Sequence, residues 1–412
     1  MSHAAILETP PAASPAGGQR PTPAELLATM RAVLPEIKAR AAETERLGRI
    51  PAESLQALRK AGLYRIVKPA KFGGYEYDFD MLVELVMELG QACASTAWVY
   101  GLYAAHQWLL ASFDEKVQRE IWDNDTDPAV CGSYAPAGKA TAAAGGYVLN
   151  GNWSFASGCD GAQWAVCASV LPADENGHAP GPAFFLVPAS DYLIHGDWDV
   201  VGLAGTGSKT LVLDNVFVPA HRLLAFSATM SGRTPGSKVH ANPGFRIPML
   251  SNVPSCLAAA GVGAATGALA DYIEATGKRI TRGAVAGGNN RMAEFPTIQL
   301  RVADAAASTD AAREILLRDV RARALTIRSG ETISNDDRIL SRRGQAFAVS
   351  LAIRAAEALN ASTGGYGLSM SNPVQRAWRD VNAVGRHISL NWDAVGTMSG
   401  QMALGLEPKG QY

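Results

Sequence analysis

The sequence predicts an α+β protein, mostly helical, in which an N-terminal helical domain, a central antiparallel β-domain and a C-terminal four-helix bundle follow in order. Before residue 129 and after about residue 248, apolar residues recur at the three- and four-residue spacing of amphipathic helices. Between these blocks lie short β-rich runs separated by Gly, Pro, Asn and Asp. The expected boundaries are a disordered arm rich in Ala, Pro, Gly and Ser at 1–22, then 23–128, 129–240 and 241–412.

The N-terminal block contains several distinct helical stretches. The first begins at Pro23, and a second has Pro51 near its start and Gly62 as its stop signal. The apolar stretch over residues 79–113 is too long for one ordinary helix, and we expect two buried helices that are broken near Gly90.

Five β-rich runs make up the middle block, including AVCGSYAP from Ala129 and KTLVLDNVFVP from Lys209. The run GYVLNGNWSF predicts a hairpin that turns at Asn150-Gly151, because that dipeptide favours a two-residue turn. After the middle block, four long helical segments predict an antiparallel bundle, and the last of them spans residues 379–405.

Charge and cysteine usage exclude several classes. The 37 basic and 38 acidic residues leave a net charge of −1, so there is no basic field for nucleic acid or an anionic membrane. Five scattered cysteines without a CxxC pair, and no signal peptide, favour a reducing cytoplasm. We see no apolar run of about 18 residues, and so expect no membrane span.

Two glycine-rich motifs look like nucleotide sites but fit poorly. Gly261–Gly267 is one residue too long for a dinucleotide fingerprint and lies in a helical segment, where small residues serve close helix packing. Gly202–Thr210 resembles a phosphate loop, but a strand follows it, so we favour a turn between strands. No HExxH motif, His/Cys cluster or GxSxG elbow is present, so we expect no metal, and any reducing power must come from elsewhere.

Motifs along nearly the whole chain resemble the acyl-CoA dehydrogenase family, which implies the same helix–β–helix fold. They are PAKFGG at Pro69–Gly74, DNVFVP at Asp214–Pro219, and a C-terminal run with GGYG at 364–367, Pro373, Gln375-Arg376 and Arg379-Asp380. Many dehydrogenases of the family carry a glutamate base shortly after the Arg-Asp pair. Here the count places Ile388 at that position, beside His387, and an aliphatic side chain cannot abstract a proton.

Four other segments resemble the oxygenase components of two-component flavin-dependent monooxygenases, of the 4-hydroxyphenylacetate hydroxylase and steroid-ring hydroxylase type. They are GSYAPAGK, NGNWSFASGCDGAQW, GSKTLVLDNVFVP and RHISLNWD. The resemblance implies reduced FMN or FAD supplied by a separate NAD(P)H:flavin reductase, and reaction with molecular oxygen. The expected activity is hydroxylation of an aromatic, phenolic small molecule through a C4a-hydroperoxyflavin, in a homotetramer.

The resemblance implies three catalytic residues. His387 is expected near the phenolic oxygen, where an imidazole favours the phenolate and makes the ring electron-rich. Ser157 is expected to hydrogen-bond the N5 region of the flavin, and a hydroxyl can both donate and accept. His106, on an apolar helix, is expected to face the substrate hydroxyl, with a hydrogen-bonded core histidine as the alternative.

Other residues are candidates for binding the cofactor. Ser133 is a candidate contact to substrate or flavin, and aromatic side chains can wall the isoalloxazine. Arginines after a bundle helix often reach a flavin phosphate across a subunit contact in this fold. The candidates are Ser133, Trp153, Phe155, Trp164, Arg279, Arg282, Ser208 and Lys209.

Two other functions compete with the oxygenase. An acyl-CoA dehydrogenase with bound FAD requires a carboxylate base from another helix, as some branches of the family have. A helical scaffold that has lost its flavin predicts that Ser157 and His387 do not share a pocket. The sequence does not identify the substrate, and phenols, hydroxyphenyl acids, indoles and steroid-derived rings all remain open.

Overall fold

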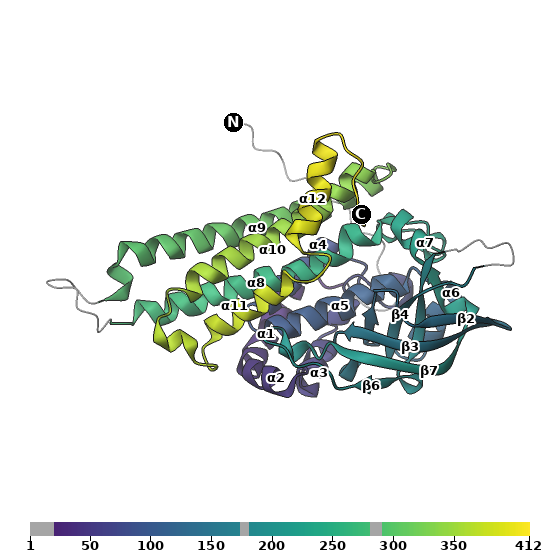
Figure 1. Cartoon of the computed structure of the whole chain (residues 1–412), viewed down its shortest axis with the longest axis horizontal. Coiled ribbons are helices and arrows are strands. Elements are labelled where there is room, and N and C mark those ends of the chain that lie inside the picture. The colour runs from purple at the N-terminus through teal and green to yellow at the C-terminus, as the bar shows by residue number, and fades with distance from the viewer. Residues whose placement is uncertain (1–19, 174–180, 281–290) are drawn as a thin grey trace.

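A computed structural model describes residues 20–173, 181–280 and 291–412 of the chain (Figure 1). Helices α1 to α6 form the first part, and the first helix begins where the sequence predicts. Thr22 caps it in a capping box with Glu25, which satisfies the first free backbone N–H groups. These helices span Pro23–Ala39, Ala41–Leu47, Ala52–Lys60, Phe79–Gly90, Ala94–Leu110 and Glu115–Trp122.

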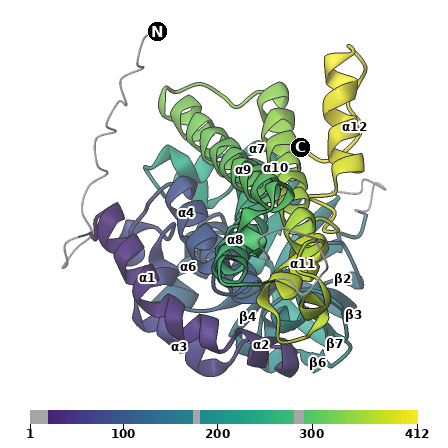
Figure 2. The same ribbon diagram turned by 90° about the vertical axis from the view of Figure 1, so that its left-hand side faces the viewer.

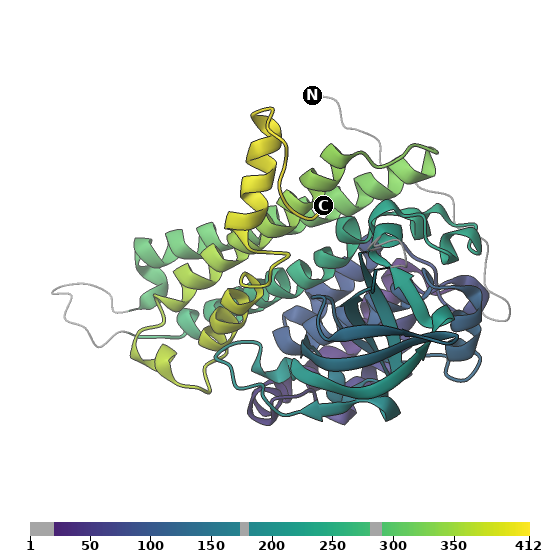
Figure 3. The ribbon, with the colours of Figure 1, turned by 45° about the vertical axis from the view of Figure 1, so that its right-hand side comes forward.

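Helix α5 (Ala94–Leu110) is the centre of the molecule. The predicted break near Gly90 is confirmed, because α4 ends at Gly90 and α5 begins four residues later. Every residue of α5 except Leu102 is buried, so α5 is covered on all sides. The two sheets lie on one side of the helical layer that contains it, and the bundle extends on the other (Figure 3).

The β-domain consists of two four-stranded sheets. One has the order β1-β4-β5-β8 and the other β2-β3-β7-β6. The neighbouring strands are antiparallel, as predicted, except for β1 and β4, which pair in parallel. The first sheet comprises Val130–Ser133, Trp164–Val170, Pro182–Pro188 and Leu223–Ala225, and the second comprises Lys139–Ala143, Gly146–Ala156, Lys209–Pro219 and Leu193–His195. The short helix α7 (Phe226–Ser231) follows β8.

The predicted hairpin at Asn150-Gly151 is wrong. Strand β3 runs through both residues, and the tight turn lies earlier, between Ala143 and Gly146. Asn150-Gly151 instead forms an irregularity in the β3–β7 pairing, where the Asn150 side chain accepts a hydrogen bond from the backbone N–H of Asn215. The dipeptide therefore marks a bulge, in which glycine relieves a close backbone approach.

The C-terminal part is the predicted antiparallel bundle, with one difference. Helices α8 (Met249–Gly277), α9 (Pro296–Arg328), α10 (Asn335–Asn360) and α11 (Pro373–Val384) pack together (Figure 2). The expected single helix over residues 379–405 is instead two elements, because α11 ends at Val384 and α12 (Trp392–Ala403) projects away from the bundle. His387 therefore lies in a turn rather than within a helix.

Close packing explains Gly263 and Gly267 of α8. A Cβ at Gly263 would lie 2.3 Å from the carbonyl oxygen of Met87 in α4, and one at Gly267 would lie 2.4 Å from that of Gln91. The packing interpretation of Gly261–Gly267 is thus confirmed. Contrary to expectation, α8 is long and apolar enough by composition to cross a membrane, but 83% of its most apolar window is buried inside the protein.

Gly263→Ala should lower the stability of the protein by about 1–3 kcal/mol, because the new methyl group overpacks the α4–α8 contact. Thermal unfolding of the purified protein measures this change. Gly277→Ala in the last turn of the same helix is the matched control, since nothing lies within 4 Å of its added methyl group. Equal unfolding temperatures for the two variants would contradict this account of the packing.

Candidate active site

Three segments far apart in the sequence meet at the N-terminal half of α5. The indole N–H of Trp98 donates a hydrogen bond to Ser157 Oγ at 3.1 Å, in the turn that follows β3. The ring of His387, between α11 and α12, stands edge-to-face against the Trp98 ring with centroids 5.5 Å apart. Trp98 therefore links the two strongest sequence candidates, Ser157 and His387, in one site.

The backbone next to Ser157 is strained. Phe155 lies in an irregular stretch of the β3–β7 pairing and has φ 64°, a value that is unfavourable for a bulky residue. Its side chain is 70% exposed and stands edge-to-face against Trp198, with ring centroids 6.0 Å apart. Strain that presents an apolar ring outward is typical of a ligand site.

Ser208 also joins Ser157, from the loop that precedes β7. The two hydroxyl oxygens are 2.7 Å apart, and Thr206 Oγ1 lies 2.6 Å from Ser208 Oγ. All three side chains are buried. Ser208 was a candidate for binding the cofactor, and the structure places its hydroxyl against Ser157.

Helix α11 holds this loop in place across the domain boundary. Asp380 Oδ1 accepts a hydrogen bond of 2.7 Å from the backbone N–H of Leu203, which has the unfavourable φ of 54°. Arg379 donates to the Val201 carbonyl at 2.6 Å and pairs with Glu45. Burial raises the pKa of Asp380 to about 6, and the Leu203 N–H opposes that rise. The Arg-Asp pair thus positions the loop.

The geometry of His387 defines its protonation. Its Nδ1 accepts a hydrogen bond from the backbone N–H of Ser389 at 3.2 Å, so in the neutral ring the proton resides on Nε2. Burial first, and the positive charge of Arg342 second, lower the pKa of His387 to about 4. The imidazole is therefore neutral near pH 7, with Nε2–H as its hydrogen-bond donor. Ile388, at the dehydrogenase base position, is 80% exposed.

His106 occupies a different place from the one expected. It is 0% exposed, its Nδ1 lies 2.5 Å from the Val130 carbonyl oxygen, and its Nε2 lies 2.8 Å from the Tyr134 hydroxyl. Burial lowers its pKa to about 4. It lies eight residues beyond Trp98, about 12 Å along the helix. Both ring nitrogens are occupied within the protein, which is the alternative of a hydrogen-bonded core histidine.

The sheet candidates also lie inside the protein. Trp153 is fully buried and donates its indole N–H to the Ala168 carbonyl at 2.6 Å, so it is part of the β-domain core rather than a wall of the site. Ser133 is buried and donates to the Ser154 carbonyl. Trp164 packs against Arg222, and Lys209 pairs with Asp160 at 2.7 Å.

The arginine candidates are remote from Ser157 within one chain. Arg279 lies just beyond the far end of α8, where it donates to the Thr363 carbonyl and lies 5.9 Å from the ring centre of Tyr366. It is 23 residues beyond Cys256, which lies beside Gly101 of α5, so about 35 Å of helix separates it from α5. Arg282 lies outside the described residues.

Two functional side chains were missed by the sequence analysis. Trp98 lies in an apolar run that contains no recognisable motif, so nothing in the sequence indicated a role in the site. Thr206 lay in the glycine-rich segment that was weighed only as a phosphate loop. Neither role is visible until the fold brings α5, the β3 turn and the β7 loop together.

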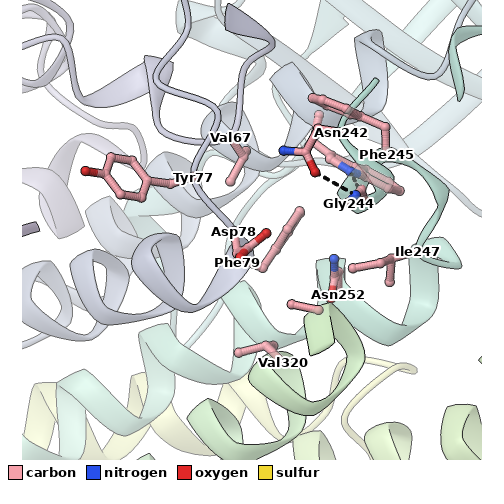
Figure 4. Close-up of a pocket in the computed structure, with 12 residues that line it drawn as sticks. Val67, Tyr77, Asp78, Phe79, Asn242, Gly244, Phe245, Ile247, Asn252 and Val320 are labelled. Atoms are coloured by element: carbon pink, nitrogen blue, oxygen red, sulfur yellow. Dashed lines mark hydrogen bonds between the residues drawn. The ribbon is translucent and has the colours of Figure 1, made fainter. Parts of the chain in front are cut away.

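Two of the cavities in the described part of the chain differ in character. An open cleft of about 470 Å³ lies beside the site and is lined by residues that include Arg46, Trp198, Val201, Met370 and Arg379, a size that suits a cofactor. The other cavity has a volume of about 10 Å³, room for a single water, and lies among Phe79, Asn242 and Asn252 (Figure 4). It is too small for a substrate.

The residues around the cleft fit a flavin. Phe155 offers an exposed aromatic ring, and Ser157 has a buried hydroxyl oxygen beside it. Trp198 lines the cleft and contacts Phe155, which joins the cleft to the site. Fold and site together define a flavoenzyme of the acyl-CoA dehydrogenase architecture.

Comparison with known proteins identifies the family. The acyl-CoA dehydrogenase N-terminal domain matches residues 22–122, and the acyl-CoA dehydrogenase C-terminal domain matches residues 255–392. The chain is 63% identical over 377 residues to the oxygenase component of the FADH(2)-dependent resorcinol hydroxylase of Rhizobium sp. (strain MTP-10005), which covers 90% of this chain and 92% of that protein.

Solved structures agree with this result. The 3-HSA hydroxylase from Rhodococcus sp. RHA1 has a TM-score of 0.89 at 36% identity and covers 94% of this chain and 98% of its own. XiaF from Streptomyces sp., in complex with FADH2 and glycerol, has a TM-score of 0.85 at 27% identity and covers 94% and 97%. The chain belongs to the acyl-CoA dehydrogenase family, and within it to the oxygenase components of reduced-flavin-dependent aromatic monooxygenases.

The His387 imidazole should remain neutral between about pH 5.5 and 8, because its pKa of about 4 lies well below the usual histidine value. Carbon-13 NMR of histidine-labelled protein measures the titration, and the spectrum of His387→Asn assigns the signal by its absence. A midpoint near pH 6.5 would show that the ring is not held neutral by burial.

Proposed function

We propose that this oxygenase hydroxylates resorcinol, or a close 1,3-dihydroxybenzene, with FADH2 as the reduced flavin. The observation that carries the proposal is that Ser157 and His387 both contact one buried indole, that of Trp98. A flavin-binding hydroxyl and a phenol-binding imidazole must be this close for an oxygen atom to pass from cofactor to ring. The 63% identity to a protein named as a FADH(2)-dependent resorcinol hydroxylase supports the substrate and the flavin.

In this proposal His387 binds the phenolic oxygen. Its Nε2–H donates a hydrogen bond to that oxygen and stabilises the negative charge of the phenolate, which makes the ring more nucleophilic. The Ser389 backbone N–H holds the tautomer that makes this donation possible. A neutral donor suits this task because it does not require an imidazolium in a buried site.

Ser157 and Trp98 act on the cofactor side. Bound reduced flavin supplies the oxygen activation. Ser157 Oγ, held by the Trp98 indole, offers a fixed polar contact to the flavin ring system. The apolar faces of Trp98 and Phe155 would shield a bound flavin from water, which would limit wasteful loss of peroxide.

The two competing functions receive less support. A dehydrogenase needs a carboxylate base, and by the count along the sequence Ile388 lies where many members of the family carry it. A scaffold without flavin predicts Ser157 and His387 in separate places, whereas both contact Trp98.

The assembly and the partner are part of the proposal. A separate NAD(P)H:flavin reductase supplies the FADH2, as expected for an oxygenase component. The five free, buried cysteines suit a reducing cytoplasm. Exposed apolar side chains on and around the C-terminal bundle support a homotetramer, in which Arg279 can reach a flavin of a second copy. They include Leu300, Leu325, Tyr366, Leu368, Ile388 and Leu404.

His387→Ala should reduce resorcinol hydroxylation by about 100-fold, because the phenolate loses its stabilising donor. Reduced FAD should still bind and be reoxidised by oxygen, now with hydrogen peroxide as the main product. Chromatography and a peroxide assay measure how much of the reduced FAD leads to hydroxylated product and how much to hydrogen peroxide. His195→Ala, in an exposed histidine of β6, is the control. Unchanged hydroxylation in His387→Ala would defeat the assignment.

Ser157→Ala should increase the fraction of reduced FAD that ends as hydrogen peroxide, since the cofactor loses its fixed polar contact. Anaerobic mixing of protein and FADH2 with oxygenated buffer, with peroxide and product quantified, tests this. The exposed Ser190→Ala should behave as the wild type. An unchanged peroxide yield in Ser157→Ala would remove Ser157 from this role.

A further inference from the structure

The hydroxyl chain at Ser157 ends in two groups whose hydrogen-bonding roles are fixed. At one end Thr206 Oγ1 donates to the Leu203 carbonyl oxygen at 2.8 Å, and a carbonyl can only accept. At the other end the Trp98 indole N–H, which can only donate, points at Ser157 Oγ. The three hydroxyls between these ends each have a single proton to place.

The donation from Thr206 to Leu203 sets the direction of the other bonds of the chain. The proton of Thr206 goes to Leu203, so Thr206 Oγ1 must accept from Ser208, 2.6 Å away. The proton of Ser208 is then used, so Ser208 Oγ must accept from Ser157, 2.7 Å away. The proton of Ser157 is used in turn, and one of its lone pairs accepts from Trp98. Ser157 has only a lone pair left for a ligand.

The structure holds the carbonyl end of this chain firmly. Asp380 accepts the Leu203 N–H at 2.7 Å, and the Trp198 indole N–H donates to the Leu203 carbonyl at 3.3 Å. A Cβ at Gly202 would lie 2.3 Å from the Arg379 carbonyl, so the loop lies tightly against α11. All three hydroxyls are buried, and a low local dielectric strengthens the hydrogen bonds between them.

We propose that Thr206 and Ser208 are positioning residues that fix the direction of the Ser157 hydroxyl, so that the site prefers a ligand N–H over a ligand acceptor at that point. The inference rests on the proposed function, which places the flavin at Ser157. The N5 atom of a reduced isoalloxazine carries a hydrogen and donates, whereas N5 of the oxidised ring only accepts. The chain of three hydroxyls therefore distinguishes reduced from oxidised flavin by the direction of its hydrogen bonds.

The test is the affinity of each redox state for a variant with a reversible chain. In Thr206→Val, Ser208 can donate to Ser157, and the Ser157 proton becomes free to point at the ligand. Oxidised FAD should then bind about 5- to 10-fold more tightly, with little change for reduced FAD. Fluorescence titration measures the first dissociation constant, and anaerobic calorimetry measures the second.

Thr44→Val is the matched control. Thr44 is buried and its side chain lies beside Gly205 of the same loop, but its hydroxyl donates to the Arg40 carbonyl of its own helix. It should leave both affinities unchanged. Ser208→Ala is a second variant in case Thr206→Val fails to fold. It removes the acceptor of the Ser157 proton, and it should therefore also tighten the binding of oxidised FAD.

The possible outcomes separate this inference from the proposed function. If Ser157→Ala alters the affinities but neither Thr206→Val nor Ser208→Ala changes the ratio between redox states, the inference is overturned while the flavin site stands. If Ser157→Ala changes neither affinity, the flavin does not contact Ser157, and the placement of the flavin fails with it. A selective gain for oxidised FAD in both chain variants supports the inference.

Discussion

The burial of α5 on all its faces is the constraint on which the rest of the structure depends. A helix covered on every side can contact the sheets, the bundle and the connecting loops at once, and Trp98 uses this position to touch both Ser157 and His387. The same burial makes an unpaired polar group on the helix costly. The Trp98 indole N–H and both nitrogens of His106 are paired accordingly. The side chains that could serve the site are therefore also needed for the hydrogen bonds of buried polar groups in the core.

The Arg379-Asp380 pair shows how the two halves of the molecule are joined. Both residues lie on α11 of the bundle, yet their partners are the backbone of residues 201–203 in the loop of the β-domain. A buried carboxylate that accepts a backbone N–H compensates part of its desolvation, and it holds Leu203 in a conformation that an isolated chain disfavours. The loop that completes the Ser157 environment is thus specified by a helix almost 180 residues later in the sequence.

The order of the domains, the break near Gly90 and the close packing of α8 were predictable, because periodicity and small residues report local structure directly. The pairing of Ser157 with His387 was predictable only through family resemblance. The turn after Val384 could not be predicted, since Gly385 has an ordinary helical backbone conformation and no proline interrupts the pattern. Asn150-Gly151 was misleading because the same dipeptide serves hairpins and bulges. Thr206, Ser208 and Trp98 depend on contacts between distant segments, which one sequence does not reveal.

The end of α11 at Val384 determines how residues 387 and 388 are presented. Were the helix to continue, the side chains of residues 387 and 388 would differ by about 100° in direction and be set by the helix alone. In the turn, the backbone N–H of Ser389 binds His387 Nδ1 and orients the ring toward Trp98, while Ile388 points to the surface. By the count along the sequence, residue 388 is the position where many dehydrogenases of the family carry their base, and here its side chain is exposed while the neighbouring imidazole faces Trp98.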